Sequence, residues 1–224
     1  MLSDTNLPVS LTGKVVRPGD GRYDALRSSY AAHGAPALII MAENAEDVAA
    51  AIGYARVQGS ALSVRSGGHG LSGASTNKGG VLLDLSGLSE VRLLDATTKR
   101  VRIGPGARWG EVAAKLAPHG LGLSSGDYGE VGVGGLLLGG GIGLLSRKHG
   151  LTIDHVVAAE IVLADGQQLR VDADNHVELF WALRGGGGAF GVVTAFELEA
   201  YELNSIIFAQ LTYDLSDIAA VLPR

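Results

Sequence analysis

The stretch LSVRSGGHGLSG, residues 62–73, places four glycines around His69 directly behind an apolar run. The run ALSVR, residues 61–65, predicts a strand. Glycines at this density usually mean that a backbone must approach another group closely, because a residue without Cβ leaves room for the approach. The sequence therefore predicts a strand that opens into a close-approach loop, and it raises the question of why a histidine stands in that loop.

A strand–helix–strand unit leads into this stretch. PALIIMA, residues 36–42, predicts a buried strand, and residues 44–59 predict a helix that Asn44 caps. Together with the strand at 61–65 and another at 80–86, these elements predict a small three-stranded α/β unit whose strands run parallel.

The remainder of the chain predicts an antiparallel unit. VRLLDATTKRVRIGPG, residues 91–106, and VVAAEIVLADGQQLRVDA, residues 156–173, are typical of β-hairpins, the second with Asp165–Gly166 as its turn. A strand at 190–203 completes the unit. The expected helices are 108–120 and 172–185, the latter capped near Asp174 or Asn175.

Composition limits the classes of function. The net charge is −5 with no basic run, which argues against nucleic-acid partners and against an anionic membrane surface. There is no cysteine, and none of the six histidines is paired at the spacing of metal ligands, so no metal site is expected. The N-terminus lacks the pattern of a signal peptide and no apolar run has membrane-spanning length, so a cytoplasmic location is expected.

Glycine is about twice as frequent as its usual share of roughly 7%, with 34 in 224 residues. It gathers in three clusters, at 67–73, 126–143 and 185–191, which suggests one large ligand wrapped by backbone. The second cluster has two open interpretations: a backbone laid against a flat aromatic system and a pyrophosphate, or an unusually tight sheet-to-helix crossover. Its apolar part, 131–145, contains seven glycines and is expected to make a poor helix.

Two literal motif matches carry little weight. GGGAFG, residues 186–191, fits G-x-G-x-x-G, but a helix precedes it and a strand follows it, the reverse of a dinucleotide fingerprint. GLSSG, residues 122–126, fits the nucleophile elbow of hydrolases, which needs a helix directly after it. The following DYGEVGVGG is not expected to begin a helix, so Ser124 is not expected to be a nucleophile.

Four motifs taken in order resemble a known family. RSGGHGLSG, GGVLLDLSGL, the long second cluster that runs on to VLADG, and LFWALRGGGGAFGVVTAFEL resemble the FAD-binding domain of berberine-bridge-enzyme-like oxidases. These are flavoproteins of the vanillyl-alcohol-oxidase type. The resemblance implies an α+β fold, the PCMH-type FAD-binding domain of two α/β subdomains, with the smaller three-stranded unit beside the antiparallel sheet. The expected divisions are an N-terminal segment at 1–35, the domain at 36–201 with parts at about 36–93 and 94–201, and the start of a truncated substrate-binding domain at 202–224.

The resemblance also implies where FAD is held. His69 matches the histidine that is bonded to the flavin 8α-methyl group, and the loop around it would bind the pyrophosphate through backbone amides. The second cluster would pass over the flavin ring, and the backbone near Ile161 and Val162 would meet the adenine. The implied FAD-binding residues are His69, Arg65, Ser66, Gly67, Gly68, Gly70, Gly126, Tyr128, Val131, Gly132, Gly135, Gly139, Gly140, Ile142, Gly143, Ile161 and Val162.

This chain departs from the pattern at one position. Where many relatives have a second flavin-bonding cysteine, it has Tyr128, so one covalent link is expected. Tyr128 is the candidate catalytic residue, and an equally open interpretation is an aromatic side chain that only packs. Val131 matches a position that lines oxygen access in relatives, which favours O2 as the acceptor.

The resulting expectation is an FAD-dependent oxidase that removes a hydride from a small-molecule alcohol, sugar or amine. One alternative is a flavin-binding module or half-enzyme that needs a homo-oligomer or a partner chain to complete its site. Another is a non-covalent FAD reductase of the same fold, which His69 among its glycines argues against.

Overall fold

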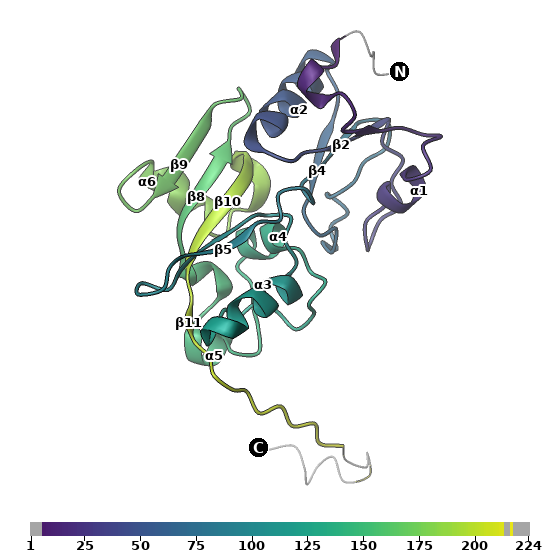
Figure 1. The fold of residues 1–224 in the computed structure, drawn as a ribbon. Coiled ribbons are helices and arrows are strands. Elements are labelled where there is room, and N and C mark those ends of the chain that lie inside the picture. Colours follow the sequence, from purple (N-terminus) through teal and green to yellow (C-terminus); the bar gives the residue numbers. More distant parts are fainter. Residues whose placement is uncertain (1–5, 213–215, 217–224) are drawn as a thin grey trace.

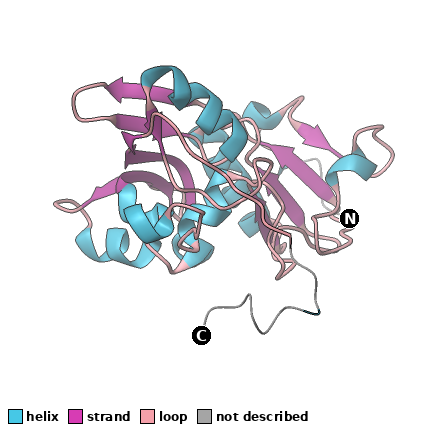
Figure 2. Ribbon diagram, turned by 90° about the horizontal axis from the view of Figure 1, so that it is seen from below, coloured by secondary structure: helices cyan, strands magenta, loops and turns pink. Residues whose placement is uncertain are grey.

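The computed structural model describes residues 6–212 and 216, and these form two lobes that are each built on one sheet (Figure 1). The small lobe has the sheet order β1-β2-β4-β3 and the large lobe β5-β6-β10-β8-β9. The expected α+β fold in two parts is therefore confirmed. Figure 2 shows the two groups of strands on either side of the molecule, with helices between and beside them.

The small lobe contains η2 (Val9–Leu11), β1 (Val15–Val16), α1 (Tyr23–Leu26), β2 (Leu38–Met41), α2 (Ala45–Val57), β3 (Leu62–Arg65) and β4 (Val81–Asp84). β2 and β3 both run parallel to β4, which lies between them. Asn44 caps α2 as expected, because its side chain accepts a hydrogen bond of 2.8 Å from the Asp47 amide. The sheet has four strands and not three, since β1 pairs antiparallel with β2 and brings the N-terminal segment into the lobe.

The large lobe contains β5 (Val91–Asp95), β6 (Arg100–Ile103), α3 (Trp109–Leu116), η3 (Ala117–His119), β7 (Leu121–Gly122), α4 (Val133–Leu138), α5 (Ser146–His149), η4 (Thr152–His155), β8 (Val156–Val162), β9 (Gln168–Asp172), α6 (Val177–Leu183), η5 (Gly187–Phe190), β10 (Val192–Glu199) and β11 (Tyr201–Glu202). Both expected hairpins form, β5–β6 and β8–β9. Because β5 begins at Val91 and belongs to this sheet, the two lobes divide just before it.

Two local expectations were wrong. The glycine-rich run does form a helix, α4, and two of its residues, Val133 and Leu137, are fully buried in the core of the large lobe. Burial of this apolar face outweighs the low helix propensity of the glycines. The N-cap position of α6 is His176, at φ 54°, and not Asp174 or Asn175, and the His176 side chain makes no capping hydrogen bond.

Helix α2 joins the two lobes. Its buried residues Val48 and Ile52 share one hydrophobic cluster with Val162 of β8 and Val192 of β10. Burying apolar surface across this seam holds the lobes in a fixed relation on one side. Across residues 6–212 and 216, no helix has the length and apolar character to cross a bilayer. The expected start of a second domain, at 202–224, lies partly outside the described residues, namely at 213–215 and 217–224.

A stack of rings lies where the described chain leaves the large lobe. His149 of α5 stacks on Tyr201 of β11 with ring centroids 3.6 Å apart, and His155 lies at 5.4 Å from the same ring. Burial lowers the pKa of His149 below its usual 6.5, and the charges of Lys148 and His155 lower it further. A neutral imidazole is therefore favoured in the folded chain.

This stack predicts a pH-dependent stability. The pKa of His149 is lower in the folded chain than the 6.5 of the unfolded chain, so between these two values the unfolded chain binds more protons. The stabilising contribution of the neutral His149 is therefore fully present above pH 6.5 and is lost as the pH falls through this window. We expect His149→Phe, which keeps a stacked ring and removes the titration, to lose this part of the dependence. Urea unfolding midpoints at about pH 7.5 and about pH 5 measure it. The same midpoint change in wild type and variant would contradict the assignment.

Candidate functional site

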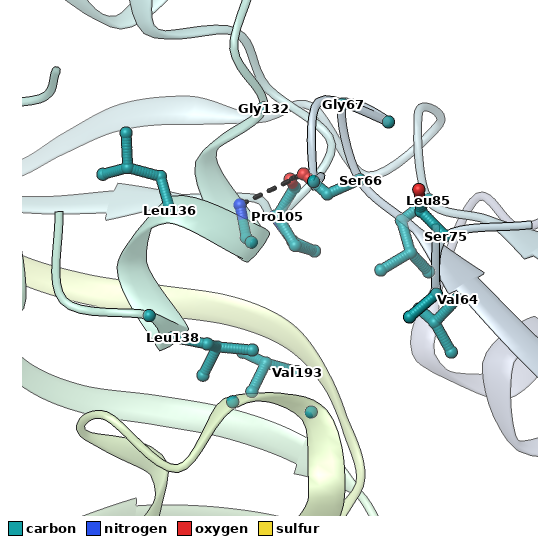
Figure 3. A pocket seen from close by; sticks show the side chains of 18 of the residues that line it. Val64, Ser66, Gly67, Ser75, Leu85, Pro105, Gly132, Leu136, Leu138 and Val193 are labelled. Carbon is teal, nitrogen blue, oxygen red and sulfur yellow. Dashed lines mark hydrogen bonds between the residues drawn. The ribbon is translucent and has the colours of Figure 1, made fainter. Parts of the chain in front are cut away.

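A cleft of about 770 Å³ runs between the two lobes. This volume falls in the range of small-molecule and cofactor sites. Figure 3 shows Val64, Ser75 and Leu85 of the small lobe on one side, and Leu136 and Leu138 of α4 with Val193 of β10 on the other. The cleft is therefore a mainly apolar slot with polar groups concentrated in the loop after β3.

The loop after β3 turns sharply at Gly68, which has φ +73° and so adopts a conformation that favours glycine. Within the described part of the chain, the amide N–H groups of Gly68, His69 and Gly70 donate no hydrogen bond. Successive unpaired amides in a turn of this kind form a concave anion-binding surface. The loop can therefore bind a phosphate or pyrophosphate group.

Arg65, which begins the expected FAD-binding loop, does not line the cleft with its side chain. The guanidinium is buried and pairs with Asp84 at 2.6 Å, and it also donates to the carbonyl oxygens of Leu26 and Ser28. Its contribution is to anchor the end of β3 to β4 and to the N-terminal segment, and thereby to fix where the loop starts.

Two side chains hold the first glycine loop against the second. The Ser66 hydroxyl donates to the Pro105 carbonyl oxygen at 2.6 Å and accepts from the Gly134 amide at 3.1 Å. The Arg108 guanidinium donates to the carbonyl oxygens of Gly67 at 3.1 Å and Glu130 at 2.7 Å. Both loops are thus fixed to each other by hydrogen bonds before any ligand is considered.

Gly67 and Gly132 lie where the loops touch, and Figure 3 shows the two side by side. A Cβ atom on Gly132 would overlap the Gly67 amide nitrogen and the Ser66 hydroxyl, and would come within 2.6 Å of the Gly67 Cα. The backbone of Gly132 has φ −73° and ψ 144°, which any residue can adopt. Close approach, and not backbone conformation, is therefore the reason for glycine here.

His69 is half-buried and lines the cleft. Its imidazole is stacked on Tyr30, with ring centroids 5.6 Å apart and an interplanar angle of 18°. Tyr128 approaches the same ring edge-on at 5.8 Å. Tyr128 is 57% exposed and lies outside the cleft wall, so the structure brings the two candidate residues of the sequence together with only His69 in the wall.

The second glycine cluster divides into two halves. Val131, Gly132, Gly135 and Gly139 line the cleft. The later half packs against the chain instead, since a Cβ on Gly143 would come within 2.6–2.8 Å of Ser124, Ser125 and Gly126. The first half of the cluster therefore faces the cleft, and the later half makes a tight turn packed against neighbouring backbone. The predicted residues outside the cleft wall are Arg65, Gly126, Tyr128, Gly140, Ile142, Gly143, Ile161 and Val162.

The third glycine cluster belongs to the cleft, and reasoning from the sequence did not assign it. Gly187, Gly188 and Gly191 line the wall. Ile161 and the Val162 carbonyl oxygen lie directly behind Gly191, where a Cβ would come within 2.6–2.9 Å of them. The signal was present, because three glycine clusters suggested one ligand, but the reversed order of helix and strand removed this one from consideration.

The cleft also contains a polar group without a partner. The Ser75 hydroxyl lines the wall and is buried with no hydrogen bond to any described residue. A buried hydroxyl of this kind is costly unless a ligand or a water completes it. In the described ranges, no three His, Cys, Asp or Glu side chains gather in a way that could bind a metal ion. The donor set is suited to an organic ligand with an anionic group.

Comparison with known proteins agrees with this geometry. Residues 36–172 match the family described as FAD binding domain. The chain is 40% identical over 205 residues to (R)-6-hydroxynicotine oxidase of Paenarthrobacter nicotinovorans. The matched region covers 91% of this chain and 44% of that protein.

Two solved structures share the fold. The crystal structure of 6-hydroxy-D-nicotine oxidase from Arthrobacter nicotinovorans has a TM-score of 0.83 at 40% identity, over 87% of this chain and 43% of that one. Glucooligosaccharide oxidase from Acremonium strictum, described with a 6-S-cysteinyl, 8α-N1-histidyl FAD, has a TM-score of 0.79 at 35% identity, over 84% and 40%. The chain thus spans less than half the length of each of these relatives.

Proposed function

The chain belongs to the family of FAD-binding domains and takes FAD as its cofactor, and from this premise we propose that the cleft between its lobes holds FAD with His69 covalently attached to it. The observation that carries the proposal is the loop with unpaired amides at Gly68, His69 and Gly70 and with the imidazole of His69 in the cleft wall. The amides bind the pyrophosphate, and the imidazole meets the 8α-methyl group of the flavin.

The other predicted residues take their places around this centre. The cleft-lining half of the second cluster, Val131 to Gly139, lies along the flavin, while Ile161 and Val162 support the wall at the adenine end. The glucooligosaccharide oxidase described above has a histidyl link at the flavin 8α position, and a single link is proposed here because Tyr128 replaces the second attachment residue.

We propose further that the protein is an oxidase. Bound FAD would supply the acceptor for a hydride from a substrate carbon, and O2 would then take up the two electrons with that hydrogen's proton and the proton of the substrate O–H or N–H group, to leave as H2O2. The residues of this chain bind and orient the cofactor, exclude water with the apolar walls of the cleft, and leave Val131 in the wall where O2 would enter. Tyr128 is the proposed catalytic side chain, because it is exposed next to His69 at the edge that a substrate can reach.

The proposed substrates are small alcohols, sugars or amines. The two named relatives support this range, since one is a hydroxynicotine oxidase and the other a glucooligosaccharide oxidase. Peroxide release by the fully flavinylated chain, measured across these three substrate classes, tests the oxidase proposal. No peroxide with any class would contradict it and would favour a flavin-binding module that needs a partner.

His69→Ala tests the attachment. The denatured wild-type chain is expected to keep its yellow flavin in a pellet, while the denatured variant releases all of it, because no other nucleophile is proposed for the bond. The variant is expected to bind FAD reversibly, since the amides and walls remain. His119→Ala removes an exposed histidine on η3 outside the cleft and is expected to match wild type. Retention of flavin by His69→Ala would contradict the proposal.

A further inference from the structure

The N-terminal segment 26–34 is fastened to the loop that carries His69. The Tyr30 amide donates a 2.8 Å hydrogen bond to the Gly68 carbonyl oxygen. Just before Tyr30 in the segment, the Ser28 carbonyl oxygen accepts a hydrogen bond from Arg65 at 3.1 Å and the Arg27 carbonyl oxygen accepts one from the Thr76 hydroxyl at 2.6 Å. The backbone of Tyr30 is therefore fixed relative to the turn at Gly68, one residue before His69.

The Tyr30 ring does little for the core. It is 76% exposed, so it buries little apolar surface and contributes little to folding through burial. What it does contact is the imidazole of His69, in an offset stack that falls in the favourable range for aromatic pairs. Its position is therefore better explained by the imidazole than by packing.

The glycines of the loop create the need for such a contact. Gly67, Gly68 and Gly70 have no side chains with which to restrict the χ angles of His69. Among the described residues, the His69 ring stacks on Tyr30 and makes a T-shaped contact with Tyr128. An imidazole that must present one nitrogen to a fixed carbon atom loses reactivity when it rotates freely.

We propose that Tyr30 is a positioning residue for flavin attachment, which holds the imidazole of His69 in the orientation that brings a ring nitrogen to the flavin methyl carbon. This inference rests on the proposed attachment at His69. The step exchanges an imidazole N–H bond and a methyl C–H bond for one C–N bond. The two protons and two electrons released pass to O2, which becomes H2O2.

The test follows attachment directly. Protein prepared without flavin is mixed with FAD in air, and covalent flavin is measured over time as fluorescence of the denatured chain. Tyr30→Ala and Tyr30→Leu are expected to slow attachment roughly 3- to 10-fold, the size expected from losing one aromatic pair. Tyr30→Phe keeps the ring and is expected to restore the wild-type rate. Trp181→Ala, which removes a 70% exposed aromatic ring outside the cleft wall, is the matched control and is expected to have no effect.

A second readout needs no cofactor. In the flavin-free chain, the ring current of Tyr30 shifts the imidazole proton resonances of His69. We expect this shift to disappear in Tyr30→Ala and Tyr30→Leu and to remain in Tyr30→Phe. Reversible FAD affinity, measured in the His69→Ala background, is expected to be the same with or without Tyr30.

The outcomes separate the two proposals. If His69→Ala keeps covalent flavin, the attachment proposal fails, and the resonance shift still tests the stack. If His69→Ala loses covalent flavin while both Tyr30→Ala and Tyr30→Leu attach it at the wild-type rate, the positioning role is wrong. A slow Tyr30→Phe would also overturn it, because the ring would then not be the active feature. Should Tyr30→Ala fail to fold, Tyr30→Leu gives the decision.

Discussion

Gly132→Ala is expected to destabilise the chain by about 3 kcal/mol, the upper end of what overpacking usually costs. The new Cβ would overlap the Gly67 amide nitrogen and the Ser66 hydroxyl, and backbone cannot yield as a flexible side chain would. The two loops must separate, which breaks the hydrogen bond from the Gly134 amide to the Ser66 hydroxyl and the bridge that Arg108 makes between the loops. Urea unfolding measures the loss of stability. Equilibrium binding of FAD should weaken in parallel, because the same loops form the proposed pyrophosphate site.

Gly53→Ala is the matched control. Gly53 lies inside α2 with nothing within 4 Å of the added Cβ, so alanine is expected to stabilise the helix by about 0.5–1 kcal/mol. A Gly132→Ala chain as stable as wild type would show that the loops do not touch as the structure has them. Reduced FAD binding by Gly53→Ala would show that the assay responds to glycine substitution in general.

Asp84→Asn is the other change with a large expected effect, a loss of about 3–5 kcal/mol. Arg65 and Asp84 face each other across the ends of β3 and β4, with side chains only 8% and 4% exposed. Removing the carboxylate leaves the guanidinium buried without its counter-charge, and its Nη2 already has no described partner. Denaturant unfolding measures the loss, which is a large part of the total stability of a typical domain.

Asp20→Asn provides the comparison at the surface. Asp20 pairs with Arg22 at 2.8 Å, but the arginine side chain is 57% exposed and water screens the pair. We expect little change in stability. Equal effects at Asp84 and Asp20 would contradict the account of Arg65 as the buried anchor of the loop.

Much of the fold follows from short-range patterns. The cap at Asn44 and the turn at Asp165–Gly166 depend on neighbouring residues, so the sequence predicts both α2 and the β8–β9 hairpin. The helix α4 could not be predicted in this way. Its stability comes from Val133 and Leu137 in a core that is assembled from distant strands, and no local propensity contains that information.

The site divides in the same manner. The setting of His69 among glycines is a local signal that singles it out, and the family resemblance supplies its proposed role in flavin attachment. Tyr30 has no local signal, because its partner lies 39 residues further along the chain and only the folded segment 26–34 brings the two rings together. The glycines of the second cluster look alike in the sequence, and only packing separates Gly132, which faces the first loop, from Gly143, which faces Ser124.

The most direct test of flavin attachment is the mass of a single peptide. Trypsin cleaves after Arg65 and Lys78, and the peptide 66–78 between these sites contains His69 as its one histidine. From flavin-saturated protein, this peptide is expected at its own mass plus that of FAD, less the hydrogens that the new bond displaces. The peptide at its unmodified mass, with flavin free in solution or on another peptide, would contradict the central claim.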